Sequence, residues 1–488
     1  MPLDRYEGKE IKFSQWTLKE LNQWNKMGLL PAFESQDIEA ACAFFGALDV
    51  LSWFAPEVLT LVHGAAGCSL NVAPARAWPG SSAAHRPKPF CTAMDASQVV
   101  YGGEDRLRQA LKEVDARYTP RLIVILTNCC SYIIGEDVAG VVESLASELH
   151  TDVRYLQVAG CTGEGFRQGA YQALDLVFSY IAETQPRLKP NGARPSINLF
   201  TKRVSGRPAE LSDVEEVRRL LGKIGVDVNT VVRLGTPYDE LAALSRAQAN
   251  ATLCYTFGRG PLESLNRLFG QPYAPMTFPL GLEGTLAWVD QVAQLVGVPN
   301  TFPQDPEVAE ARAKIERLKE KVAGREAYVW QPGEKGLATT MFVAELGAKP
   351  VLFGMSYYLE QQLRPTVELL LSRGHNIDIV LSGKHKLLMK ARDIPLEQRP
   401  LLFMAKKYWL GRCPGVAFNF FTDRLLGLKG IDTLIAEVER ALEMATTKDY
   451  RLFNRYVEIL YRATEWQVDG EIIEGVDHKD PKWKQWNR

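Results

Sequence analysis

Several cysteines in the sequence stand where they could bind a metal cluster. Cys68 ends the turn His-Gly-Ala-Ala-Gly-Cys, which directly follows a β-rich stretch at residues 59–63. Cys129 follows the apolar stretch RLIVILTN, and Cys42 lies upstream of both. Cysteine thiolates are the usual ligands of iron–sulfur clusters. Each cysteine also has a purely structural interpretation, because a free cysteine is among the most frequently buried residues.

The number and spacing of the cysteines argue against two other common uses. No CxxC pair occurs, so an ordinary zinc or ferredoxin site is not supported. Eight cysteines in 488 residues do not suggest a disulfide framework in the cytoplasm, where thiols stay reduced. We expect a cytoplasmic protein because the first residues, MPLDRYEGKEIKFSQW, lack a signal-peptide core. No later segment has the roughly 18 uncharged apolar residues that cross a bilayer.

The predicted elements place these thiols at one edge of a sheet. Strands are predicted at 59–63, 122–127 and 153–158, and helices at 136–149 and 166–184. This alternation indicates a parallel sheet covered by helices, whose strand ends would bring Cys68 and Cys129 to the edge where ligands bind. Gly64 and Gly67 would let backbone approach a bulky cluster without a Cβ in the way. His63, a lone histidine at a strand end, is expected to be a hydrogen-bonding group rather than a ligand.

The alternation of strands and helices continues in two further series. We therefore predict an α/β protein of three Rossmann-like domains with parallel, helix-covered sheets, and clusters at strand carboxyl ends and at domain or subunit interfaces. The predicted parts are an N-terminal arm without a clear strand at 1–40, a domain carrying the interfacial-cluster cysteines at 41–190, a domain with Cys254 at 191–304, a third domain at 305–445 and a C-terminal helical tail at 446–488.

Composition and glycine pattern bear on the possible partners. The net charge is −1, with 46% hydrophobic and 24% charged residues, which is typical of a soluble globular protein without a nucleic-acid or membrane surface. The chain has no GxxxxGK(S/T) stretch and no GxGxxG turn after a strand, so we do not expect it to bind ATP or NAD. Any energy that its chemistry needs must come from another protein.

Taken together, the motifs resemble those of one family, the larger component of nitrogenase and its relatives. The resemblance covers about residues 40–445 and is densest in the first third. It is carried by VHGAAGC at 62–68, DASQVVYGGEDRL at 95–107, TNCCSYIIGEDV at 127–138 and EGFR at 164–167.

The resemblance implies that Cys42, Cys68 and Cys129 are half of the ligand set of an interfacial electron-relay cluster of the 8Fe–7S or 4Fe–4S type. The other half would come from a homologous partner subunit in a heterotetramer. Cys129 rather than Cys130 matches, because the family cysteine lies six residues before the Gly of the IleGlyGluAsp turn. Cys130 is then a structural neighbour, and for Cys161, on a nearby loop, burial is favoured over a ligand role.

The resemblance implies a second site at Cys254, which lies in the apolar stretch AlaAsnAlaThrLeuCysTyr. In cofactor-bearing subunits of the family, a cysteine here anchors a large active-site iron–sulfur cofactor, and Tyr255 matches as well. Here the cofactor would be nitrogenase-cofactor-like or its all-iron precursor. Arg76 matches an arginine at the cofactor entrance, and Gln172 matches a glutamine after the GlyPheArg turn. The structural alternatives are a buried strand-end thiol and a surface arginine.

Two departures from the family pattern bear on the reaction. Where dinitrogen-reducing subunits carry a histidine beyond the glutamine, this chain has Asp175 or Leu176. The histidine that anchors the far end of the cofactor is missing near Ala417, and neither Cys413 nor His385 matches its motif. These departures argue against dinitrogen reduction as the predicted activity.

The leading hypothesis is an oxidoreductase, a nitrogenase-like subunit fed by a homodimeric, ATP-binding 4Fe–4S reductase protein. Without the nitrogenase histidines it most resembles the methylthio-alkane reductases, which cleave C–S bonds of small methylated sulfur compounds. The alternatives are a nitrogenase-cofactor assembly scaffold, a true nitrogenase subunit, a tetrapyrrole reductase and a sugar- or nucleotide-binding α/β protein. Cys254 argues against a tetrapyrrole reductase, which would need an open pocket and no cofactor thiol.

Overall fold

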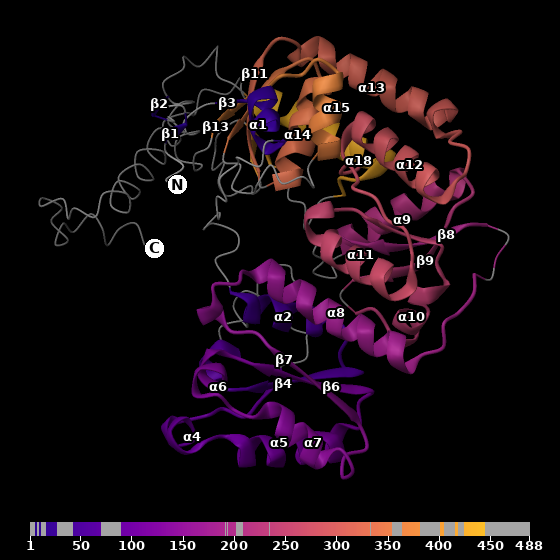
Figure 1. Cartoon of the computed structure of the whole chain (residues 1–488). Helices are drawn as coiled ribbons and strands as arrows, with labels where there is room; N and C mark the ends of the chain where they lie inside the picture. Colours follow the sequence, from indigo (N-terminus) through magenta and orange to yellow (C-terminus); the bar gives the residue numbers. More distant parts are fainter. Residues whose placement is uncertain are drawn as a thin grey trace, which may run out of the picture.

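The computed structural model in Figure 1 describes residues 5–6, 9–10, 16–26, 42–69, 89–190, 192, 194–201, 208–233, 235–331, 333–353, 364–380, 401–404, 415–417 and 424–444. Within them the chain forms three mainly parallel sheets packed against helices. The predicted α/β class with three Rossmann-like units is confirmed. No helix in these ranges is long and apolar enough to cross a membrane.

The first sheet carries the candidate thiols and has the strand order β5-β4-β6-β7, all parallel. Its strands are β5 (Phe90–Cys91), β4 (Val58–His63), β6 (Leu122–Thr127) and β7 (Asp152–Gln157). β4 and β6 are buried at every residue. Their nearly continuous apolar sequences, VLTLVH and LIVILT, are typical of strands covered on both faces.

Helices cover both faces of this sheet, as Figure 1 shows. α2 (Ala43–Leu51) and α8 (Phe166–Thr184) pack on one face, and α5 (Glu104–Tyr118) and α7 (Val138–Leu145) on the other. Neighbouring residues of β6 serve opposite faces: Val124 joins the α2 and α8 core, whereas Ile123 and Ile125 join the α5 and α7 core.

The second sheet has the parallel order β10-β8-β9. Its elements are β8 (Ser196–Phe200), α9 (Pro208–Lys223), β9 (Asp227–Val232), β10 (Ala249–Thr252) and α11 (Tyr255–Phe269). α11 packs against α8 of the first unit, so Phe178 and Leu262 belong to one hydrophobic cluster. The first two units are therefore joined through the helices that follow their candidate sites.

The third sheet has the order β15-β14-β11-β12-β13-β3. Its parallel strands are β11 (Glu326–Trp330), β12 (Lys349–Phe353), β13 (Asp378–Val380), β14 (Leu401–Met404) and β15 (Gly415–Ala417). β3 (Trp16–Thr17) adds an antiparallel edge to β13, and α1 (Leu18–Lys26) follows it. The sequence indicated no clear strand in the N-terminal arm, because a two-residue strand has no readable period and its pairing is long-range.

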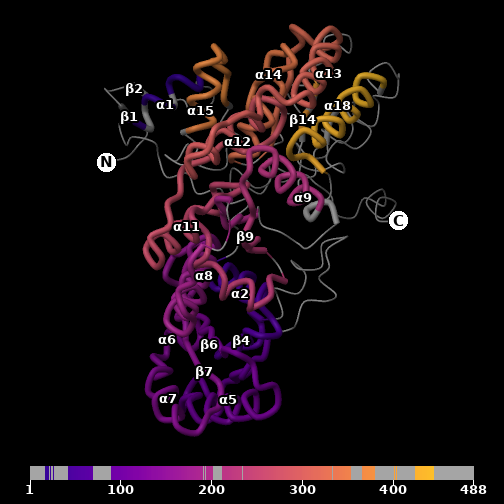
Figure 2. Tube along the Cα trace, turned by 90° about the vertical axis from the view of Figure 1, so that its right-hand side faces the viewer, coloured from indigo at the N-terminus to yellow at the C-terminus, as the bar shows by residue number. Residues whose placement is uncertain are grey.

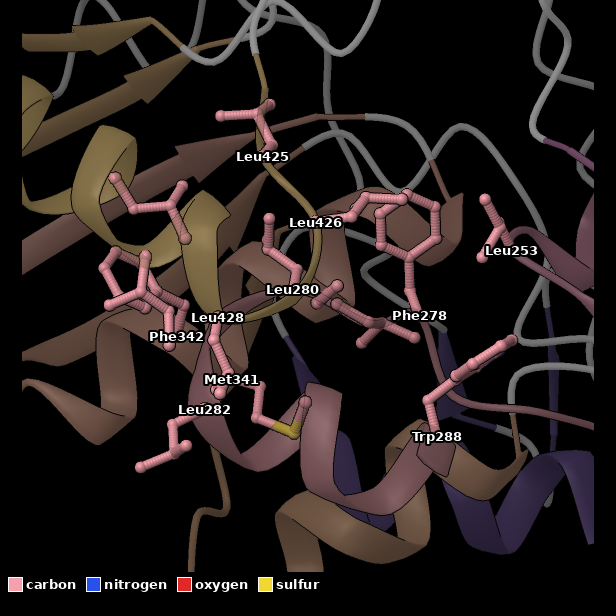
Figure 3. Close-up of a cluster of buried hydrophobic side chains, with 14 of the residues drawn as sticks. Leu253, Phe278, Leu280, Leu282, Trp288, Met341, Phe342, Leu425, Leu426 and Leu428 are labelled. Atoms are coloured by element: carbon pink, nitrogen blue, oxygen red, sulfur yellow. The ribbon is translucent and has the colours of Figure 1, made fainter. Parts of the chain in front are cut away.

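The second and third sheets share one hydrophobic core, shown in Figure 3. α12 (Gly281–Val296), α14 (Gly333–Glu345) and α18 (Gly427–Met444) supply much of it, with Trp288, Met341 and Phe342 among the buried side chains. The buried Trp288 Nε1 donates to the carbonyl of Thr252, 2.9 Å away. In Figure 2 the first unit occupies one end of the molecule, and α14 and α18 lie toward the other.

The remaining elements are shorter or lie outside this core. They are β1 (Arg5–Tyr6), β2 (Lys9–Glu10), α4 (Ala96–Tyr101), α6 (Cys129–Ile134), η2 (Gly160–Thr162), α10 (Tyr238–Ala242), η3 (Leu244–Arg246), η4 (Phe302–Gln304), α13 (Pro306–Val322) and α15 (Arg364–Ser372).

Candidate functional site

Thiols gather at the carboxyl edge of the first sheet. Cys68 lies in the helical turn after β4, Cys129 opens α6 after β6, and Cys161 lies in η2 after β7. The group consists of Cys42, Cys68, Cys91, Cys129, Cys130 and Cys161. The structure therefore brings together the three cysteines that the sequence singled out for a relay cluster, and adds three more. The burial expected for Cys161 is wrong, because its short turn leaves the residue exposed.

Cys42 reaches this edge because α2 and α8 pack unusually closely. Its backbone forms an isolated antiparallel bridge with Gly165, and the next amide, of Ala43, donates to the carbonyl of Glu164 at 3.0 Å. A Cβ on Gly46 would strike the carbonyl of Phe166, which makes glycine necessary in this helix pair. The EGFR turn thus serves to hold Cys42 against the neighbouring loop.

Two thiols lie close to the backbone at Gly160. A Cβ on this residue would lie 2.8 Å from Cys42 Cβ, 2.9 Å from Cys42 Sγ and 3.6 Å from Cys129 Sγ. The Cys42 side chain therefore occupies the space that a side chain at Gly160 would fill. Gly64, predicted to make room for a cluster, instead makes room for the Asn128 side chain and has a φ of 150°.

The electrostatics of the group disfavour free thiolates. Burial raises the pKa of the Cys68 thiol, and the neighbouring thiols of Cys129, Cys42, Cys91 and Cys130 raise it further. Charged sulfurs so close together repel one another, whereas a bound cation would stabilise them. Within the described ranges, no three His, Cys, Asp or Glu side chains are placed to hold a single metal ion. A multi-iron cluster makes a different demand, because its thiolates bind separate irons.

Cys91 and Cys130 have defined hydrogen bonds, through the thiol in Cys91 and through the backbone amide in Cys130. The Cys91 thiol donates to the carbonyl of Gly64 at 3.6 Å and accepts from the amide of Ala93 at 3.3 Å. The sequence gives no local signal for Cys91, because its strand, β5, has only two residues. Cys130 follows Cys129 on α6, where its amide donates to the Asn128 side chain at 3.0 Å.

His63 lies beside the thiols but is engaged elsewhere. Its side chain is fully buried, with Nδ1 3.2 Å from Thr92 Oγ1 and Nε2 3.2 Å from Glu136 Oε2. Glu136 also accepts from the amide of Gly103 at 2.6 Å. Burial lowers the pKa of the His63 ring despite the nearby carboxylate. These contacts agree with the hydrogen-bonding role expected for His63.

The second candidate site is built around one thiol. Cys254 stands at the position before the first residue of α11 and is 2% exposed, and burial together with the nearby Glu334 carboxyl raises the pKa of its thiol. Glu334, on α14, hydrogen-bonds to this thiol and accepts from the amide of Thr256 at 3.2 Å. Burial raises the pKa of Glu334 to about 7. The sequence gave no local signal for Glu334, because only the packing of α14 on α11 brings it there.

Two residues of α8 to which the family pattern drew attention, Gln172 and Asp175, have hydrogen-bond partners. Gln172 donates to Glu164 at 3.3 Å, and its buried Oε1 has no hydrogen-bond partner in the described part of the chain. Asp175, where the family histidine was expected, accepts from Ser264 Oγ at 2.5 Å and pairs with Arg267. Both of these partners lie on α11, so Asp175 ties the two helices together. Three other candidates, Arg76, Cys413 and His385, lie outside the described residues.

Comparisons with known proteins agree on one family. A family model described as Nitrogenase component 1 type Oxidoreductase matches residues 42–391. A light-independent protochlorophyllide reductase subunit of Heliobacterium modesticaldum is 24% identical over 80% of this chain and 75% of its own length. The nitrogenase molybdenum-iron protein alpha chain of Methanosarcina barkeri is 23% identical over 67% of this chain and 63% of its own.

An assembly protein and a solved structure are also similar to the chain. The nitrogenase iron-molybdenum cofactor biosynthesis protein NifE of Bradyrhizobium diazoefficiens is 25% identical over 82% of this chain and 73% of its own length. A solved chain named Nitrogenase Cp1 at pH 5 superimposes with a TM-score of 0.57 at 17% identity, over 86% of this chain and 92% of that chain. At this identity the structural likeness shows the fold.

Proposed function

The chain belongs to the nitrogenase component 1 type oxidoreductases, and from this premise we propose that it is the catalytic subunit of a nitrogenase-like iron–sulfur reductase. The observation that carries the proposal is the gathering of six thiols at one sheet edge, with Gly160 leaving room for the Cys42 side chain. An ordinary core has no need of so many thiols beside one another in a half-buried loop region.

Cys42, Cys68 and Cys129 would hold an iron–sulfur cluster of the 8Fe–7S or 4Fe–4S type. The residues fit such a group, since the ligand atoms are thiols and the neighbouring backbone at Gly160 has no Cβ to obstruct them. A cluster bound here supplies one-electron redox chemistry. The thiolates set its position, and the buried His63 with Glu136 keeps the end of β4 in place.

Two kinds of protein partner follow from this function. A homologous subunit, in a heterotetramer, completes the interfacial ligand set. A homodimeric ATP-binding 4Fe–4S reductase protein docks on the apolar surface formed by Val100, Tyr101 and Ile133, which are 71%, 88% and 70% exposed. The support for this surface is its place: α4 and α6 pack together, and α6 begins with Cys129. Docking there brings an electron donor close to the thiols.

Cys254 would anchor a second, large active-site iron–sulfur cofactor, either nitrogenase-cofactor-like or its all-iron precursor. Cys254 is 2% exposed, so its thiol would be a metal ligand shielded from water. The unpartnered Oε1 of Gln172 is a buried acceptor that can orient a substrate or cofactor group. Arg76 is assigned to the cofactor entrance by family resemblance.

The reaction we assign is reductive C–S bond cleavage of small methylthio-alkanes. Support comes from the departures from the dinitrogen-reducing pattern, above all Asp175, which is engaged with Ser264 and Arg267 and is 42% exposed in its side chain. A group tied to the neighbouring helix in this way is a poor proton donor to a buried cofactor. The similarity to a NifE protein favours one alternative, a scaffold that holds a precursor cofactor and passes it on.

The test uses the complex purified without oxygen. It is given its iron protein, ATP and a reductant, and the release of hydrocarbon and methanethiol from a methylthio compound is assayed. Turnover supports the reductase. Absence of turnover, combined with transfer of iron to an apo-enzyme, would identify the scaffold, and a purified complex with little iron would contradict both.

A further inference from the structure

We propose that Glu136 is the positioning residue of the docking surface, and that its buried carboxylate sets how tightly the electron-donor protein binds. The docking surface consists of Val100 and Tyr101 on α4 and Ile133 on α6. The inference rests on the proposed function, because it takes this surface as the place where the ATP-binding reductase protein docks. It goes further by assigning the affinity for that protein to a residue beneath the surface, whose side chain is 3% exposed.

The two helices of the docking surface have little core of their own. Each has six residues; every residue of α4 is exposed or half-buried, and α6 buries Ser131. Helices this short are unstable by themselves in water. α4 and α6 contact each other, and Figure 1 shows them at the same end of the first unit. Their relative position must therefore be fixed by contacts at their ends.

Glu136 joins the carboxyl ends of both helices. α4 ends at Tyr101 and continues through Gly102 to Gly103, whose amide donates to Glu136 Oε1 at 2.6 Å. α6 ends at Ile134, and Glu136 follows after the left-handed Gly135, which has a φ of 74°. A single carboxylate thus closes the turn after α4 onto the turn after α6.

The same carboxylate ties the two helices to the sheet. Its Oε2 lies 3.2 Å from Nε2 of His63, the last residue of β4. Because a carboxylate only accepts, Nε2 donates, and the ring Nδ1 accepts from Thr92 Oγ1 at 3.2 Å. Thr92 Oγ1 in turn accepts from the amide of Gly64 at 3.1 Å, in the turn that leads to Cys68. One buried chain of hydrogen bonds therefore connects the docking surface with the start of the thiol loop.

A matched arrangement at the other end of the sheet provides a control. Asp115 on α5 is buried, accepts from the amides of His150 and Thr151 at 3.0 and 2.9 Å, and lies 3.2 Å from His150 Nδ1. These two residues precede β7, at the amino end of the strands, whereas α6 follows the carboxyl end of β6. Both carboxylates hold main-chain amides and a histidine, and Glu136 is the one beneath the docking surface.

The experiment measures the Kd of the reductase protein for the complex by biolayer interferometry without oxygen, so the result does not depend on the reaction catalysed. Glu136→Ala releases the end of α4, and we expect Kd to rise at least about tenfold, within the usual range of coupling between two sites. Iron content should be unchanged, and so should kcat at saturating reductase protein, because only binding is weakened. Glu136→Gln should restore Kd, since its amide can accept from Gly103 and donate to His63.

The control variant is Asp115→Ala, which should lower the thermal midpoint as Glu136→Ala does but leave Kd unchanged. A Glu136→Ala variant with the wild-type Kd, or with an increase no larger than that of Asp115→Ala, would overturn the inference. If Glu136→Ala does not fold, Glu136→Asp replaces it. Its shorter side chain cannot reach both Gly103 and His63, so Kd should still rise, and an unchanged value would overturn the inference.

Tyr101→Ser separates the inference from its premise. If this variant binds the reductase protein as the wild type does, the docking surface of the proposed function is wrong, and the inference fails with it. If Tyr101→Ser weakens binding and Glu136→Ala does not, only the inference fails. If Tyr101→Ser instead releases the partner subunit during size-exclusion chromatography, the surface serves subunit pairing, and the assignment of Glu136 to donor binding is overturned.

Discussion

The carboxyl edges of the first and second sheets both present cysteine, but their construction differs. The first gathers six thiols around the strand ends, with the Cys42 sulfur packed against Gly160. The second has one buried thiol, Cys254, hydrogen-bonded to the carboxyl of Glu334. Under the proposed function, the first edge would offer thiolate ligands to several irons of one cluster. The second would fix a cofactor at one point and leave its other faces to further groups.

The difference also lies in what surrounds each thiol. At the first edge the neighbours that raise a thiol pKa are other thiols, so the same metal ions that bind one sulfur also relieve the repulsion among the rest. At the second edge the neighbour is a buried carboxyl that also accepts amides at the start of α11. Glu334 therefore has a structural task as a helix cap, and metal binding at Cys254 must leave that cap intact.

The strongest test of the comparison is Cys68→Ala. We expect loss of the relay-cluster signal and at least about a 100-fold loss of methylthio-alkane reduction, more than the loss of an outer hydrogen-bonding partner costs. EPR spectroscopy and the turnover assay measure the two effects on one preparation. Cys130→Ala, from the same group of thiols, should keep both. A Cys68→Ala variant with full electron transfer would refute the ligand role.

Cys254→Ala should separate the two edges. Activity should fall by at least about 100-fold because the cofactor loses its anchor, while the relay-cluster EPR signal persists. The thermal midpoint of the variant serves as its control, since removing one buried sulfur leaves the rest of the core in place. Loss of both signals together would mean that the substitution unfolds the chain and that the two edges are not independent.

Gly160→Ala tests whether the first edge is built around sulfur. The new Cβ would lie 2.8 Å from Cys42 Cβ, so we expect a loss of about 1–3 kcal/mol in the free energy of unfolding, as for other overpacked sites. Urea unfolding of the apo-protein measures it. Gly67→Ala is the matched control: its Cβ would meet nothing within 4 Å, and its effect should stay within about 0.5 kcal/mol. If Gly160→Ala were as stable as the wild type, the backbone around Cys42 would have moved to accommodate the new Cβ without loss of stability.

The sequence predicted the first edge better than the second for a physical reason. Cys68 and Cys129 follow strands whose apolar runs are local signals, and parallel strands bring their ends together by rule. Cys91 could not be predicted, because a strand of two residues has no recognisable alternation of apolar and polar residues. The role of Glu334 could not be predicted either, because Glu334 contacts Thr256, 78 residues away in the sequence, only through the packing of α14 on α11. When a site is formed by the packing of two distant helices, its residues have no characteristic spacing in the sequence.

Asp175→Asn gives the smallest expected effect and tests the second edge. The substitution removes the ion pair with Arg267. Because the side chains of Arg267 and Asp175 are 56% and 42% exposed, the free energy of unfolding should fall by less than about 1 kcal/mol. Activity should stay within about twofold, because Asp175 joins α8 to α11 and does not serve the reaction. Arg267→Gln removes the same pair from its other side and should behave alike. If Asp175→Asn alone lost activity in a pH-dependent manner, Asp175 would be the proton donor that replaces the family histidine.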